Sequence, residues 1–168
     1  MSEPPNNIGK IAWTWWDKLV GSDGVKRAAR AKLRRCATPL DAFSIHETLV
    51  LVRQLKAAHP WVKEERVAIL AIVLAQVKER TSDPLARALG RRTFGDKDSA
   101  VMSEARFRRL LQAEDDELMD QFRRTVRLLK GNANPASIAE TLLNWNDATR
   151  KRFIFDYYNV SSDSPASP

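Results

Sequence analysis

The stretch VAILAIVLAQV, residues 67–77, is the longest apolar run in the chain, and Lys78, Glu79 and Arg80 follow it directly. An α-helix needs about 20 apolar residues to cross a bilayer, so this run is too short to span one. We therefore expect a helix that is buried in the core of a globular protein, and no membrane partner.

The length and the cysteine content indicate a small cytoplasmic protein. A chain of 168 residues suits one ordinary domain, or two small bundles that share a core. The single cysteine, Cys36, has no partner for an internal disulfide, and the opening residues MSEPPNN lack the basic and then apolar pattern of a signal peptide. We expect a protein of the reducing cytoplasm that is stable without a disulfide.

The spacing of apolar residues predicts an all-α fold. Proline and glycine are sparse between residues 8 and 160, apolar residues recur at intervals of three and four, and no run of strict alternation is long enough for a strand. We predict about eight or nine helices in one compact protein. The first five cover about residues 8–20, 22–36, 38–59, 63–80 and 83–90. Of those that follow, one begins near residue 103, the next spans residues 115–130, another begins at residue 134, and the last ends near residue 159.

One segment interrupts the helical pattern. The sequence RRTFGDKDSAV, residues 91–101, carries scattered charge and Gly95 but no helical period, which is typical of a loop or of a boundary between two sub-bundles. We therefore predict an N-terminal helical bundle over residues 8–95 and a C-terminal one over residues 100–160. The remaining residues, 161–168, read SSDSPASP and have the composition of a disordered tail.

The balance of charge indicates an anionic partner. The chain has 28 lysines and arginines against 21 acidic residues, a formal net charge of +7. The stretch FRRTVRLLK, residues 122–130, holds four of these positive charges. At 100° per residue, Arg123, Arg127 and Lys130 share a narrow arc that points away from the apolar face of their helix, and Arg124 lies further round.

Two interpretations of this arc stay open. Acidic residues begin the same helix and basic residues end it, as the helix dipole favours, and Asp120 can pair with Arg124 four residues on. The charges would then only keep the helix solvated. Alternatively, the arc binds an anion, and its recurrence in two other segments supports this interpretation.

The two other segments are GVKRAARAKLRRC, residues 24–36, and SEARFRRLLQ, residues 103–112. Each has basic residues on one side of a helix and apolar residues on the other. Signs do not alternate in the first segment, as they usually do on a helix built for solubility. Arginine dominates all three stripes, and its planar fork suits phosphate oxygens. The basic positions in these two segments are Lys26, Arg27, Arg30, Arg34, Arg106 and Arg109.

Tryptophans offer a second contact with nucleic acid, because each base that stacks on an aromatic ring contributes about 1–3 kcal/mol. Trp16 shares a helix face with Ala12 and Leu19, so we expect it in the core. Trp13 and Trp15 could stack or pack, and their position alone does not decide. Two further tryptophans, Trp61 and Trp145, are expected to anchor the core or an interface.

Signals of catalysis are nearly absent. His46 and His59 fall on one predicted helix without a cysteine or carboxylate placed to complete a metal site. The carboxylates of EDDEL, residues 114–118, stand where a helix start favours negative charge. The sequence has neither a glycine-rich phosphate loop nor a nucleophile elbow. We expect no catalytic residue, no metal site and no cofactor.

Several motifs follow one another in a fixed order along the chain: WWDKLVG (15–21), LRR (33–35), PLARALG (84–90), SEARFRRLL (103–111), FRRTVRLL (122–129) and RKRFIFDYY (150–158). No single motif is specific, but the ordered set covers the chain from about residue 8 to residue 158. This order resembles the CasB family, the small subunits of the type I-E CRISPR surveillance complex Cascade. One departure is Phe155, where the family pattern has tryptophan.

The resemblance implies a non-catalytic, all-helical subunit that works inside a larger assembly. Its partners would be the other Cascade subunits, the guide crRNA, the target DNA strands and a second copy of itself. Its basic surface would help to hold the guide-bearing backbone and the opened strands of the R-loop. By motif, the resemblance adds Arg35 to the basic residues above. The full set of expected nucleic-acid-binding residues is Lys26, Arg27, Arg30, Arg34, Arg35, Arg106, Arg109, Arg123, Arg124, Arg127 and Lys130.

Two other classes of protein share this composition. A helix-turn-helix regulator would also be small, basic and helical, but it reads base edges with Asn, Gln or Arg on a recognition helix, whereas these stripes are nearly pure Arg and Lys. A helical adaptor that binds no nucleic acid would explain the packing but would leave three arginine stripes without a role.

Overall fold

The computed structural model describes residues 8–92 and 99–160, which form ten helices and two strands of two residues each. The all-α class is confirmed. Most of the loop predicted near residue 95 and the whole predicted tail lie outside the described residues. The helices are α1 (Ile8–Leu19), α2 (Gly24–Arg34), α3 (Pro39–Ala42), α4 (His46–Ala58), α5 (Glu64–Leu74), α6 (Leu85–Gly90), α7 (Glu104–Leu111), α8 (Asp115–Leu128), α9 (Pro135–Leu143) and α10 (Asp147–Tyr157); the strands are β1 (Glu79–Arg80) and β2 (Asn132–Ala133).

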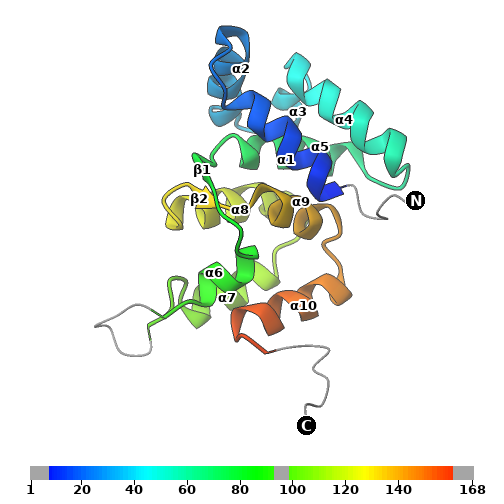
Figure 1. Ribbon diagram of the computed structural model, residues 1–168. Helices are drawn as coiled ribbons and strands as arrows, with labels where there is room; N and C mark the ends of the chain where they lie inside the picture. The colour runs from blue at the N-terminus through cyan, green and yellow to red at the C-terminus, as the bar shows by residue number, and fades with distance from the viewer. Residues whose placement is uncertain (1–7, 93–98, 161–168) are drawn as a thin grey trace, which may run out of the picture.

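The helices lie in three tiers (Figure 1). The upper tier holds α1 to α5, the middle tier α8 and α9, and the lower tier α6, α7 and α10. Strands β1 and β2 pair in parallel beside the middle tier, with Glu79 opposite Asn132 and Arg80 opposite Ala133. The chain therefore passes from the upper tier to the lower one, crosses the middle tier with α8 and α9, and ends in the lower tier with α10.

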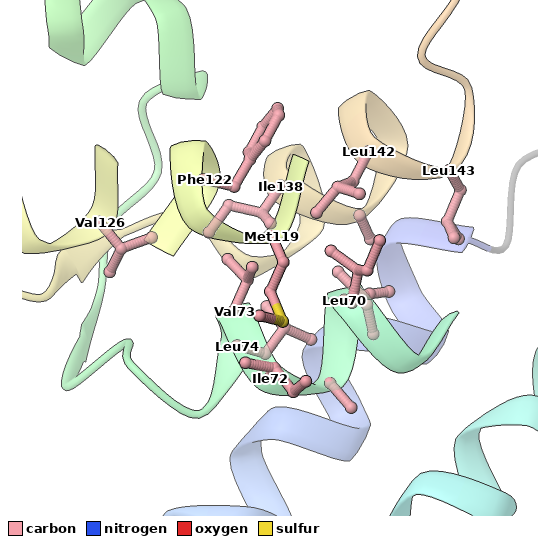
Figure 2. Packing of buried hydrophobic residues seen from close by; sticks show 14 of the residues in the cluster. Leu70, Ile72, Val73, Leu74, Met119, Phe122, Val126, Ile138, Leu142 and Leu143 are labelled. Carbon is pink, nitrogen blue, oxygen red and sulfur yellow. The ribbon is translucent and has the colours of Figure 1, made fainter. Parts of the chain in front are cut away.

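Helix α5 is the centre of the core. Every residue from 67 to 74 is buried, so the helix has no solvent face, as its apolar sequence predicts. Figure 2 shows α5 packed against α8 and α9, with Phe122 and Val126 of α8 and Ile138 and Leu142 of α9 around it. The prediction of a buried helix is confirmed.

Local signals in the sequence begin most of the helices. Asp23, Ser103, Asn134 and Asn146 each accept a hydrogen bond from a backbone N–H in the first turn of the helix that follows. Such a cap stabilises a helix by about 1 kcal/mol. Helix α3 begins at Thr38 with a complete capping box, as Thr38-Pro39 in the sequence predicts.

Two predicted helices differ in extent from the helices of the structure. The helix predicted over residues 38–59 is wrong as one unit: it breaks into α3 and α4 at residues 43–45. There the hydroxyl of Ser44 donates to the carbonyl of Asp41 at 2.8 Å, and Ile45 turns into the core. The helix predicted over residues 63–80 ends at Leu74, because the chain beyond it pairs with the segment around Gly131.

The upper and middle tiers approach closely where α1 crosses α9. A Cβ atom on Gly9 would lie 3.0 Å from the Cβ of Ala136 and 2.7 Å from Oε2 of Glu140, so any larger residue at position 9 would force these neighbours to shift. The buried cluster is continuous from α1 to α10. The division into two bundles near residue 95 stays a prediction. Within the described residues, no helix is both long and apolar enough to cross a membrane.

Candidate nucleic-acid interface

A groove of about 440 Å³ runs between α7 and α8. Four of the arginines selected from the sequence line it, two from each helix, and all four are exposed. The structure therefore brings together two stripes that are separate in the sequence. The lining residues are Met102, Arg106, Arg109, Gln121, Arg124, Thr125, Arg127 and Leu128.

Burial of the opposite faces of α7 and α8 turns these arginines outward. Phe107 and Leu110 of α7 are buried, and the Phe107 ring stacks on that of Tyr157 with centroids 3.9 Å apart. Helix α8 buries Phe122 and Val126 in the core. A connection of three residues joins the two helices, so their basic borders meet along one groove.

The groove arginines have no carboxylate partner within the described residues. The ion pairs found between residues 8–92 and 99–160 include none of the four. In particular, the pair expected between Asp120 and Arg124 does not form. Three acidic residues of α8, Asp115, Asp116 and Glu117, lie in its first turn, where Asp115 is bonded to Arg66 at 2.7 Å. Four uncompensated guanidinium groups around one hollow attract phosphate.

The basic residues of α2 form a second exposed group. Arg34 and Arg35 are exposed at its C-terminal end, and neither side chain has a bonded partner among the described residues. Lys26 is half-buried, and its Nζ lies 3.6 Å from Oε2 of the buried Glu47. Arg27 is exposed and donates weakly to the carbonyl of Ser22 at 3.4 Å.

Two of the expected binding residues are held by the protein itself. Arg30 donates from Nε to the carbonyl of Ala75 and from Nη2 to that of Val77, both at 3.0 Å, at the end of α5. Burial, and secondly the charge of Arg34, lower the pKa of Arg30. Arg123 donates from Nη2 to the carbonyl of Cys36 at 2.7 Å. Arg123 was predicted to point away from the apolar face of its helix as a free binding residue, but the residue is half-buried and its guanidinium is bonded beyond the end of α2.

These two arginines belong to a structural pattern that the sequence did not reveal. Arg66 donates to the carbonyl of Leu142 at the end of α9, and Arg150 donates to that of Leu111 at the end of α7. Each arginine satisfies carbonyl groups that the end of a helix leaves without partners. Periodicity within one helix cannot identify such an arginine, because the acceptor lies 39 to 87 residues away.

Lys130, the last residue of the basic arc in residues 122–130, lies beyond the end of α8. Lys130 is exposed and has a φ of 60°, so it follows the helix instead of extending its face. Gln121 and Thr125 line the groove beside the arginines, and neither was selected from the sequence. Gln121 stands three residues before Arg124, so helical spacing could have placed it on the same face. Arg108 is also exposed but does not line the groove.

The tryptophans mostly pack. Trp15, Trp16 and Trp145 are buried, and each indole N–H donates to a backbone carbonyl, so these rings are not available to bases. Trp13 is half-buried beneath Arg80, whose Cζ lies 4.7 Å from the ring centroid. Trp61 is 53% exposed and contacts His59 edge-on.

Contacts within the fold account for the surroundings of the Asp115 carboxylate and of the Cys36 thiol. Within residues 8–92 and 99–160, His, Cys, Asp and Glu side chains form no group of three that could hold a metal ion. The hydrogen bond and the charge of Arg66 lower the pKa of Asp115. Burial and, secondly, Asp41 raise the pKa of the Cys36 thiol, against a smaller opposite effect of Arg123.

Comparison with known proteins identifies the family. The family model for CRISPR-associated protein Cse2 matches residues 29–158. A Cse2 protein of Thermus thermophilus is 26% identical over 151 residues, which cover 88% of each chain. The crystal structure of a Cse2-family protein from Thermus thermophilus matches with a TM-score of 0.69 and 27% identity, over 90% of this chain and 98% of that one.

Two further crystal structures share the fold. CasB from Thermus thermophilus matches with a TM-score of 0.69 and 26% identity, over 90% of this chain and 98% of that one. A chain in the structure of Escherichia coli Cascade bound to a PAM-containing double-stranded DNA target matches with a TM-score of 0.64 over 89% of this chain and 97% of that one. Its identity is 19%, so this match concerns the fold alone. The family model spans most of the chain, and the chain therefore belongs to the Cse2 family of CRISPR-associated proteins.

Proposed function

We propose that this protein is the small subunit of a type I-E Cascade complex, and that it binds nucleic-acid backbone through the groove between α7 and α8. The observation that carries the proposal is the set of four guanidinium groups that two helices contribute to one groove and that have no ion-pair partner among residues 8–92 and 99–160. The Escherichia coli chain with the same fold comes from a Cascade complex bound to double-stranded DNA, which supports the assignment.

The groove would act on any nucleic-acid sequence. Arginine contacts with phosphate carry no information about the bases, so they hold a strand without selecting it. Selection would come from pairing between the guide crRNA and the target strand. The subunit would stabilise the opened strands of the R-loop by compensating their charge. It would work beside the other Cascade subunits and a second copy of itself in the cytoplasm, and it would catalyse no reaction itself.

The test uses the protein assembled with its partner subunits and a guide crRNA. In the Arg106→Gln/Arg127→Gln variant, each helix loses one groove charge, and we expect the affinity for target DNA to fall at least tenfold, because one hydrogen bond to a charged group contributes about 1.5–3 kcal/mol. The slope of log affinity against log salt should become shallower by about 0.7–0.9 for each lost contact. Binding is measured by mobility shift between about 50 and 200 mM salt.

Arg108→Gln is the matched control, because it removes the same charge from α7 at an exposed position outside the groove. Wild-type affinity and slope in the groove variant, within a correctly assembled complex, would refute the proposal. A tight preference for one duplex sequence that does not depend on salt would favour a helix-turn-helix regulator. Assembly with a protein partner but no binding of nucleic acid would favour an adaptor.

A further inference from the structure

Arg123 occupies a different position from the other arginines of α8. Its Nη2 donates to the carbonyl of Cys36 at 2.7 Å, and this bond joins α8 to the chain just beyond α2. The Nε atom of Arg123 is buried and has no hydrogen-bond partner within the described residues. The side chain is thus directed towards the end of α2.

The neighbouring arginines of α8 line a surface that does not include Arg123. Arg124 and Arg127 line the groove between α7 and α8, and Arg123 does not. A phosphate group in that groove could reach Arg123 only if the bond to Cys36 broke and the guanidinium left its half-buried position. A direct contact with a ligand would therefore cost the protein a charge-assisted hydrogen bond.

The bond connects the two exposed basic groups of the molecule. Arg34 and Arg35 immediately precede Cys36, whose carbonyl accepts the bond, and Arg124 immediately follows Arg123. Helices α2 and α8 also both contact α5. The bond at Arg123 thus links the segment that carries Arg34 and Arg35 directly to the helix that carries Arg124 and Arg127.

We infer that Arg123 is a positioning residue: it holds Arg34 and Arg35 at a fixed distance from the groove, so that one nucleic-acid backbone contacts both. The inference rests on the proposed function of the groove. In this role Arg123 positions other arginines, and its own charge does not compensate a phosphate group. This role distinguishes it from Arg124 and Arg127.

A double-mutant cycle on the full chain tests this role. Arg123→Lys keeps the net charge, but its single ammonium group lacks the planar fork and the reach to the Cys36 carbonyl. The second change is Arg34→Gln with Arg35→Gln. The affinity for a single-stranded oligonucleotide of thymidine is measured over a range of salt for the wild type, for each variant and for their combination.

We expect Arg123→Lys to make the salt slope shallower by about 1.4, the value for two lost contacts with single-stranded nucleic acid, although no charge is removed. In the Arg34→Gln/Arg35→Gln background the same substitution should have no further effect on affinity. Arg108→Lys, a charge-conserving change on the exposed side of α7, should leave the slope unchanged.

A direct phosphate contact predicts the opposite pattern: Arg123→Lys would keep the slope, and its effect on affinity would add to that of the α2 variant. That result, or no effect in either background, would overturn the inference and leave the proposed function intact. Wild-type protein whose binding ignores salt would overturn both.

Folding is checked by thermal melting and by hydrogen exchange of residues 34–38, which should become faster when the bond is lost. Exchange in these residues at the wild-type rate would contradict the role of the bond. If Arg123→Lys melts too early to be measured, Arg123→Met replaces it, because an unbranched apolar side chain fills the same half-buried space.

Discussion

Replacement of Gly90 by alanine tests how tightly the lower tier is packed. Gly90 is the last residue of α6, and a Cβ atom at this position would lie 1.9 Å from the carbonyl oxygen of Tyr157 and 2.8 Å from its carbonyl carbon. The obstacle is backbone and has no alternative rotamer. To restore an ordinary contact of 3.4 Å, the ends of α6 and α10 must separate by about 1.5 Å, since 3.4 minus 1.9 is 1.5.

The cost follows from what this separation disturbs. An added methyl group in a well-packed core typically costs about 1–3 kcal/mol. Tyr157 also donates from its hydroxyl to the carbonyl of Met102 at 2.6 Å and stacks on Phe107, so its displacement strains a buried hydrogen bond and an aromatic pair. We expect a loss of about 3 kcal/mol, at the upper end of that range. For a chain of this length, that corresponds to a fall in melting temperature of about 6–12 °C.

The assay is thermal unfolding followed by circular dichroism, supported by urea titration. Gly24→Ala is the matched control, because nothing lies within 4 Å of a Cβ atom at the first residue of α2. Its melting temperature should equal or slightly exceed that of the wild type, since alanine restricts the unfolded chain. A melting temperature of Gly90→Ala within about 2 °C of the wild type would refute the reasoning, because it would correspond to less than about 1 kcal/mol.

Two further variants probe the arginines that bind helix ends. Arg150→Gln should lower the free energy of unfolding in urea by about 2–3 kcal/mol. The reason is that Nε of Arg150 donates to the Leu111 carbonyl at 2.9 Å and its Cζ lies 4.9 Å from the Trp145 ring centroid. An unchanged urea midpoint would contradict this expectation. Asp115→Asn should cost at most about 1 kcal/mol at pH 7, since its carboxylate is 81% exposed. Arg66 lowers the pKa of Asp115, so the carboxylate stabilises the fold above its unfolded pKa of about 3.9. The difference in free energy of unfolding between the wild type and Asp115→Asn should therefore vanish as the pH falls below about 4. A difference that stays constant from about pH 7 to about pH 3 would show that the ion pair with Arg66 is not its cause.

Short-range signals predicted most of the fold. Thr38-Pro39 and Asn134-Pro135 mark helix starts through caps that involve only the next three residues, and the structure confirms both. The apolar run of residues 67–77 predicted the buried helix for the same reason, because composition alone identifies a helix without a solvent face. One failure is local, since the break at residues 43–45 involves a bond from Ser44 to Asp41, but the other depends on distant residues. Helix α5 ends early because the segment after it bonds with Gly131, which no local pattern contains.

The residues of the candidate site also fall into those that local spacing predicted and those whose position depends on distant residues. Helical spacing placed Arg106 and Arg127 beside the apolar faces of their helices, and the short connection between α7 and α8 then brings both to one groove. The same spacing cannot separate Arg123 from Arg127, since both lie on one arc of α8. Only the carbonyl of Cys36, 87 residues away in the sequence, shows which of the two is held by the protein.

The crossing of α1 and α9 has a consequence for synthesis of the chain. Gly9 meets Ala136, and 127 residues separate them, since 136 minus 9 is 127. At translation rates of about 5–20 residues per second, the apolar face of α1 waits about 6–25 seconds for its partner to leave the ribosome. During this interval α1 lacks its contacts with α9, and we expect the nascent chain to attract chaperones that bind exposed apolar helices. Slower translation before residue 136 should therefore lower the soluble yield of the protein.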